Sequence, residues 1–140
     1  MRNEGICPQR RAYHVSFVHE NKLYIHGGED FHDGIMDSIW CLDLEFLESD
    51  SKNEYESSLR KPKWRPIVQP ISKFSPGPLS RHAVVLYNSW VYVIGGSRPN
   101  GKANSELYRF EIQSSKWEIV RQRDDLPGER EGHSCCLKDD

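Results

Sequence analysis

The sequence predicts an all-β fold made of four-stranded antiparallel units that follow one another along the chain. Two observations carry this prediction. Two glycine pairs, Gly27–Gly28 and Gly95–Gly96, each end a short apolar segment, and the residues around them overlay without a gap. The flanking segments are rich in β-branched and aromatic residues, whereas apolar residues at helical spacing are confined, at most, to one inserted segment.

The overlay defines a repeated unit. A histidine stands thirteen residues before the first glycine of each pair, at His14 and His82. A strand-like stretch begins eight residues after each second glycine, as MDSIWCLD in one copy and NSELYRFE in the other. A tryptophan follows in each copy, Trp64 and then Trp117. These recurring positions indicate structural residues of a unit rather than a single site.

Each copy contains four segments of strand character. They lie at about 13–18, 23–26, 38–44 and 64–68 in the first copy and at about 82–87, 90–94, 105–112 and 117–120 in the second. Several are apolar on both faces, as HAVVLY is, which suits sheets covered on both sides. Four strands in a repeat of about fifty residues are typical of a β-propeller blade.

A third unit begins near the end of the chain. The pattern P-x-x-R-x-x-H opens the first copy with Arg11 and His14, and it recurs with Arg130 and His133. The second copy keeps the proline and the histidine but has Leu79 at the arginine position. The two arginines either lock the turn before the first strand through carbonyl hydrogen bonds or face a ligand.

The combination of these motifs resembles kelch repeats over nearly the whole chain, and the P-x-x-R-x-x-H opening is most similar to kelch proteins of the host-cell-factor and leucine-zipper-like kind. The resemblance implies blades of a kelch β-propeller at 8–70, 76–121 and 127–140, an incomplete ring of about two and a fraction blades. It also implies that the tryptophans pack against the glycines. The expected structural residues are Gly27, Gly28, Gly95, Gly96, Trp64, Trp117, Arg11, Arg130, His14, His82 and His133.

The first copy carries an insertion. Twenty residues separate Asp43 from Trp64, whereas five separate Glu111 from Trp117. The extra residues, at about 45–61, are acidic and rich in serine, and they form either a plain surface loop or a partner-binding arm. Closed propellers have about four to eight blades. We therefore expect further blades from the same chain or another, and self-association or marginal stability of this segment alone.

Composition argues against several classes of partner. The 140 residues carry a net charge of −2, which gives no reason to expect a nucleic acid or an anionic membrane as partner. No apolar run is long enough to span a bilayer, and the N-terminal residues lack the apolar core of a signal peptide. The four cysteines form neither a metal-binding spacing nor a disulfide framework, so we expect reduced thiols in the cytoplasm or nucleus.

No motif for catalysis or a cofactor stands out. The glycine pairs lead into strands rather than into a helix with a following lysine, which argues against a phosphate-binding loop. The first copy contains further histidines and aspartates, but their spacing fits no tight metal motif. Cys135 and Cys136 fall in the expected innermost strand of the third blade, where we expect both to be packed as small apolar groups. We predict no enzyme activity, no cofactor and no metal.

The predicted function is binding of a protein partner. In an antiparallel blade, the turn between strands two and three lies at the same end as the start of strand one, and the resemblance implies binding through that end. The loops there have the mixed charge and the aromatic residue of an interface. The predicted contacts are Phe31, His32, Arg81, Arg98 and Asn100. The alternatives are an enzyme built on a galactose-oxidase-like propeller and an architectural role in a larger assembly.

Overall fold

Two four-stranded antiparallel sheets make up most of the structure, a computed structural model that describes residues 6–45, 63–123 and 127–138. The first sheet has the order β1 (Val15–His19), β2 (Lys22–His26), β5 (Ile39–Asp43) and β6 (Trp64–Ile67). The second has the order β7 (Ala83–Tyr87), β8 (Trp90–Ile94), β9 (Leu107–Glu111) and β10 (Lys116–Ile119). A small hairpin joins β3 (Glu29–Asp30) to β4 (Gly34–Ile35) between β2 and β5.

The predicted fold class is confirmed. All eight strands of the two blades form where the overlay of the two copies places them, and each sheet pairs them in sequence order once the small hairpin is set aside. The β3–β4 hairpin was not predicted. In the described part of the chain no helix is long and apolar enough to cross a membrane.

Left-handed backbone at the turns sets the register of the first two strands of each sheet. β1 and β2 are joined by Glu20 and Asn21, with φ of 44° and 56°, so that His19 pairs with Lys22. Two consecutive positive φ values give the twist that a two-residue hairpin needs. Asn88, with φ of 55°, begins the equivalent turn between β7 and β8. Asparagine adopts this conformation at lower cost than most residues.

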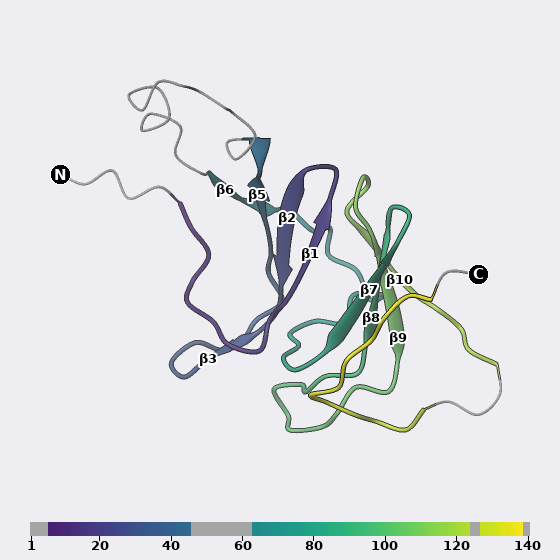
Figure 1. Cartoon of the computed structure of the whole chain (residues 1–140). Coiled ribbons are helices and arrows are strands. Elements are labelled where there is room, and N and C mark those ends of the chain that lie inside the picture. The colour runs from purple at the N-terminus through teal and green to yellow at the C-terminus, as the bar shows by residue number, and fades with distance from the viewer. Residues whose placement is uncertain (1–5, 46–62, 124–126, 139–140) are drawn as a thin grey trace, which may run out of the picture.

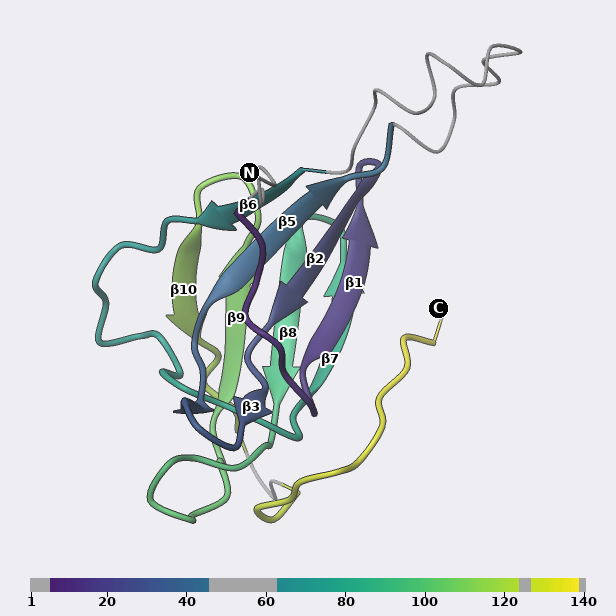
Figure 2. The ribbon, with the colours of Figure 1, turned by 90° about the vertical axis from the view of Figure 1, so that its left-hand side faces the viewer.

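The two sheets pack face to face, as Figures 1 and 2 show, with β1 in contact with β7. Side chains alternate between the two faces of a strand, and those on the facing sides of the two sheets form one buried cluster. Tyr24 and Cys41 of the first sheet and Val93 and Phe110 of the second belong to it. The buried cluster consists of Tyr24, Ile39, Cys41, Leu79, Val91, Val93, Tyr108, Phe110 and Trp117. Burial of these apolar side chains holds the blades together.

Leu79 explains the departure from the arginine pattern in the second copy. This side chain is fully buried in the cluster between the sheets, and its backbone N–H donates to the carbonyl of Met36. An arginine there would place an unpaired charge in the core. The linker before β7 is therefore part of the packing between the blades.

The third unit forms no strand within residues 127–138, although its opening residues lie against the second blade. The expectation that Cys135 and Cys136 are packed in an innermost strand is wrong for this part of the chain, since Cys135 is half-buried and Cys136 is exposed. The described residues contain no further strand with which this segment could pair. The insertion predicted at about 45–61 lies outside the described residues apart from Glu45.

Candidate interaction rim

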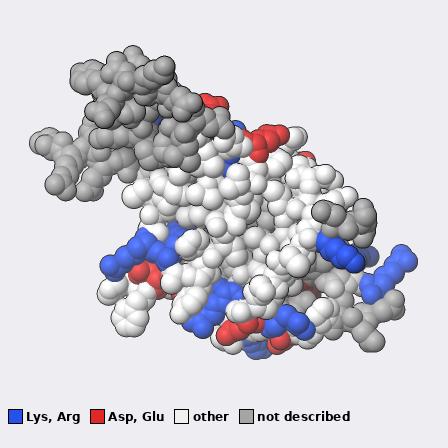
Figure 3. Space-filling view, viewed as in Figure 1, with Lys and Arg blue, Asp and Glu red and all other residues white. Residues whose placement is uncertain are grey.

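One end of the two sheets gathers the segments that the sequence singled out. The β3–β4 hairpin, the loop 97–103 and the opening segments 8–14, 76–82 and 127–133 lie at the lower end in Figure 1, and we call this surface the rim. Asp43 and Trp64, which flank the insertion, lie at the opposite end of the first sheet. Figure 3 shows charged side chains gathered along the lower edge below a largely uncharged centre.

The first glycine of each pair makes room for the next unit. A Cβ on Gly27 would lie 2.4 Å from the carbonyl oxygen of Leu79 and 2.7 Å from Cε1 of His82. A Cβ on Gly95 would lie 2.4 Å from the carbonyl oxygen of Arg130 and 2.5 Å from Cε1 of His133. Only glycine permits so close an approach of a neighbouring backbone. We call this contact of a glycine pair with the next opening segment a junction.

The second glycine of each pair makes room for the opening segment of its own unit. A Cβ on Gly28 would lie 2.9 Å from Cβ of His14, and one on Gly96 would lie 2.7 Å from Cβ of His82. The nearest neighbours of the glycines are the repeated histidines and backbone carbonyls rather than the tryptophans that the resemblance implies. Trp117 instead packs against Phe110 and His26.

Backbone hydrogen bonds connect successive opening segments. The N–H of Arg81 donates to the carbonyl of Tyr13 at 3.0 Å, and the N–H of Gly132 donates to the carbonyl of Arg81 at 2.8 Å. These three residues directly precede the three histidines, and all have positive φ, of 55°, 56° and 67° in chain order. The same unusual conformation therefore recurs once per unit, and we call this series the rim ladder.

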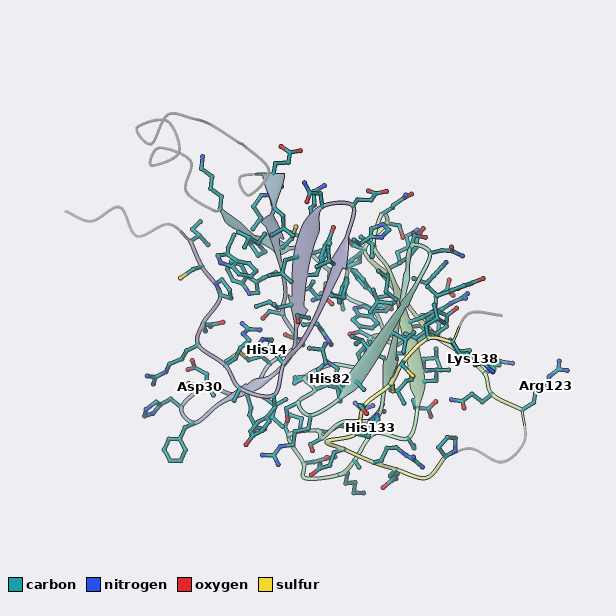
Figure 4. All side chains as sticks on the ribbon, in the orientation of Figure 1. His14, Asp30, His82, Arg123, His133 and Lys138 are labelled. Atoms are coloured by element: carbon teal, nitrogen blue, oxygen red, sulfur yellow. The ribbon has the colours of Figure 1, made fainter. Side chains whose placement is uncertain are left out.

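The three repeated histidines lie along the rim (Figure 4), and one of them forms a buried pair with a histidine of β2. Nδ1 of His26 lies 3.0 Å from Nε2 of His82, so one ring donates its N–H and the other accepts it. Burial, with smaller effects of His133 and His14, lowers the pKa of His82 to about 4. Burial and the neighbouring His82 also hold the pKa of His26 well below its ordinary value. Both rings are neutral at pH 7.

The β3–β4 hairpin carries the most exposed aromatic residue of the rim. The side chain of Phe31 is 97% exposed, and its ring meets the ring of His32 edge to face. Oδ1 of Asp30 accepts hydrogen bonds from the backbone N–H groups of His32 and Asp33, at 2.8 and 3.4 Å. Oδ2 of the same carboxylate accepts from Arg10 at 3.0 Å. These bonds, chiefly that from His32, hold the pKa of Asp30 below its ordinary value.

The sequence of the chain matches a known family profile. The profile described as the KLHDC2/KLHL20/DRC7 Kelch-repeats domain matches residues 1–140. The chain belongs to the kelch-repeat family.

Similar proteins differ widely in size. Kelch domain-containing protein 3 is 26% identical in Rattus norvegicus over 132 residues, which are 91% of this chain and 32% of that protein. The human protein of the same name is 28% identical over 135 residues, again 32% of its length. Multiple epidermal growth factor-like domains protein 8 of Homo sapiens is 29% identical over 133 residues, 4% of its length. The chain thus spans about a third of Kelch domain-containing protein 3 and a small part of the larger relative.

The arginines of the two P-x-x-R-x-x-H motifs make different contacts. Arg11 donates to the carbonyl of Gly27 at 2.9 Å and to Oγ of Ser38 at 3.2 Å, within its own unit. Arg130 is exposed and donates to the carbonyl of Gly128 at 3.1 Å. Of the two ways left open by the sequence, the contacts of Arg11 are those of a residue that locks a turn.

Four of the five predicted partner contacts fall into two groups. Phe31, His32 and Asn100 are exposed, and the side chain of Asn100 accepts the N–H of Lys102. Arg98 is occupied within the protein, since it donates to the carbonyl of Pro76 and to the side chains of Asn104 and Tyr108.

Arg81 lies between these groups. It donates to Glu29 at 3.0 Å, and its guanidinium covers the ring of Tyr13 at 4.2 Å, while 39% of its side chain is exposed.

Sequence reasoning missed three residues that organise the rim, namely Glu29, Ser80 and Asn104. Ser80 and Arg81 both donate to the carboxylate of Glu29, which holds the pKa of that carboxyl below its ordinary value. Asn104 is buried and donates to the carbonyls of Gly95 and Glu106. Its polarity at the start of the strand-like NSELYRFE stretch was a signal, and its side chain binds neighbouring backbone groups and also accepts a hydrogen bond from Arg98. The described residues contain no group of three or more metal-binding side chains.

Proposed function

We propose that this chain is part of a non-catalytic kelch propeller that binds a protein partner through the rim. The observation that carries the proposal is Phe31, a large aromatic side chain that is 97% exposed on a hairpin whose loop is held by Asp30. Exposed aromatic residues supply much of the free energy of binding at protein interfaces. A loop that is already ordered loses little conformational entropy on binding.

The neighbouring residues fit the same role. His32 and Asn100 are exposed on the rim and offer hydrogen-bonding groups, and Arg81 presents part of a guanidinium. We assign direct contacts to Phe31, His32, Asn100 and Arg81. Arg98 has a positioning role, because its three acceptors fix the loop 97–103 against the second blade.

The four cysteines are the basis on which we propose a reducing compartment for this binding. Cys7, Cys41, Cys135 and Cys136 are all free. Free thiols persist in the cytosol and nucleus, where disulfides are rare. We propose these compartments for the interaction.

The test compares Phe31→Ala with Phe74→Ala. Both remove an exposed phenylalanine ring, but Phe74 lies in the linker between the blades and not on the rim. Partners are captured from cells with the wild-type chain inside its full-length protein, identified by mass spectrometry, and then measured with purified components by calorimetry. We expect Phe31→Ala to weaken binding by about 2 kcal/mol or more, as for an interface hot spot. Phe74→Ala should leave the affinity unchanged.

The stability of both variants is measured by denaturant unfolding, since an exposed side chain contributes little to folding. Equal binding by wild type and Phe31→Ala would contradict the proposed contact. Equal losses for both variants would indicate a general effect of removing surface aromatic residues and would contradict it as well.

A further inference from the structure

Each junction contains a hydrogen-bonded pair of a glutamate and a serine, and the two residues change places between the first junction and the second. The residue after each glycine pair faces the residue two positions before the next unit's histidine. At the first junction Oγ of Ser80 donates to Oε2 of Glu29 at 2.7 Å. At the second junction Oγ of Ser97 donates to the carboxylate of Glu131. Blade one therefore supplies the carboxylate to its junction, and blade two supplies the hydroxyl.

The two junctions share the backbone bond from the second glycine to the next opening segment, and they differ in side chains at two places: the Glu–Ser pair, and the preceding residue, which is Leu79 at the first junction and Arg130 at the second. The N–H of Gly28 donates to the carbonyl of Leu79 at 2.9 Å, and the N–H of Gly96 donates to that of Arg130 at 2.9 Å. At both junctions the histidine ring of the next unit lies directly over the first glycine, 2.7 Å from a Cβ built on Gly27 and 2.5 Å from one built on Gly95. Either opening segment could therefore accept the N–H of the second glycine of either blade, although Arg130 at the place of Leu79 would also bring a charge into the core.

We propose that the Glu–Ser pair, alongside the core position of Leu79, selects which opening segment docks on which blade. Blade one fits a segment with a hydroxyl at this position, and blade two fits one with a carboxylate. If segment 127–133 docked on blade one, Glu131 would face Glu29, and two carboxylates in contact repel each other. If segment 76–82 docked on blade two, Ser80 would face Ser97 and Arg81 would lose its carboxylate partner. Each exchange replaces a charge-assisted hydrogen bond by a weaker or repulsive contact.

Arg81 strengthens the selectivity at the first junction. It adds a second donor to Glu29 at 3.0 Å, whereas the third unit has Gly132 at the equivalent position and offers no side chain. Ser80 is fully buried, so a misplaced residue there is not relieved by water. The inference concerns recognition between units of the chain and is independent of the proposed partner.

The experiment uses the second junction, where the pair lies at the surface and a substitution leaves the core intact. Amide hydrogen exchange is followed by NMR in the full 140-residue chain. The N–H groups of Gly96 and Gly132 report the second junction, and that of Gly28 reports the first. Ser97→Glu places two carboxylates in contact and should speed exchange at Gly96 and Gly132 by about tenfold, the effect of losing a hydrogen bond to a charged group.

The decisive variant is Ser97→Glu combined with Glu131→Ser. The double variant gives the second junction the same pair as the first, a glutamate after the glycines and a serine in the opening segment. The hydrogen bond is thereby restored, and exchange at Gly96 and Gly132 should return to within about twofold of wild type. Exchange at Gly28 should not change in any variant.

The matched control is Ser114→Glu, which also brings a glutamate against a carboxylate, that of Glu111, but lies away from both junctions. It should leave exchange at Gly96 unchanged. An unchanged rate in Ser97→Glu overturns the proposal. So does a double variant that exchanges as fast as the single one, or a control that has the same effect as Ser97→Glu.

Discussion

At the scale of single residues, two glycines of the rim differ in what they touch although both have left-handed backbone. Gly27 and Gly101 have φ of 65° and 75°, both in the left-handed region that favours glycine. An added Cβ on Gly27 would collide with the carbonyl of Leu79 and the ring of His82, whereas one on Gly101 would meet nothing within 4 Å. Comparing Gly27 with Gly101 therefore separates the cost of the left-handed backbone from the cost of a steric clash of the added Cβ.

We predict that Gly27→Ala lowers the free energy of unfolding by about 3 kcal/mol or more, because the clash adds to the backbone strain. Gly101→Ala should cost only about 1 kcal/mol, the conformational cost alone. Urea denaturation of both variants checks this. Equal losses would mean that the close approach of the next unit contributes nothing to stability.

At the scale of elements, the junction between the blades contains two neutral histidines that water does not reach. Their pKa values are depressed in the folded chain, that of His82 to about 4, while the unfolded value is about 6.5. The unfolded chain therefore binds more protons between these values. The contribution to stability is fully present above about pH 6.5 and is lost as the pH falls toward about 4.

We predict a loss of about 3 kcal/mol from His82 over this range, with a further loss from His26 in the same direction. Unfolding free energies measured between pH 7 and 5 isolate the histidines, because most carboxylates titrate below that window. His82→Gln keeps a hydrogen-bonding side chain that cannot be protonated and should flatten the dependence. His32→Gln, which changes an exposed histidine, should not. A pH dependence unaltered by His82→Gln would refute the role of the pair.

Sequence reasoning succeeded for the elements that repeat and failed for those that do not. The eight strands of the blades were predicted because each copy supports the assignment of the other. The β3–β4 hairpin was missed because strands of two residues carry no periodicity. The neighbours of the glycines were missed for another reason: Gly27 and His82 are far apart in sequence and meet only when two units stack.

The sequence predicted which loops gather at the rim but not the hydrogen bonds that connect them. Phe31 was found because a lone aromatic residue in a charged loop is recognisable in the sequence. The ties of Arg98 to Pro76, Asn104 and Tyr108 were not, since three separate segments supply the acceptors. The pairing of Glu29 with Ser80 likewise depends on the stacking of two blades.

At the scale of the whole molecule, the second blade has one face that the first blade covers and one that stays accessible. The accessible face holds a groove of about 590 Å³. Its lining residues are Val85, Tyr87, Tyr92, Ile94, Leu107, Leu137 and Lys138. Exposed apolar surface of this kind favours association, and units in repeat proteins depend on neighbours for burial.

We predict that the 140-residue chain self-associates in a concentration-dependent way. Ile94→Lys, which places a charge in the groove, should shift the chain toward monomer in analytical ultracentrifugation. Val68→Lys is the control, because Val68 is 84% exposed and lies outside the groove. A wild-type chain that stays monomeric across the accessible concentration range would contradict the prediction.

The rim ladder has a consequence for how such a surface changes over time. Its three equivalent positions hold a phenol at Tyr13, a guanidinium at Arg81 and no side chain at Gly132, yet all keep the same left-handed backbone. The hydrogen bonds that link them use only main-chain atoms. The side chain displayed at this position therefore varies while the main-chain bonds between the opening segments are kept, and at the first junction the Arg81 side chain adds its own bond to Glu29. A substitution at this position that tolerates the left-handed backbone would change the displayed side chain and keep the main-chain bonds between the units.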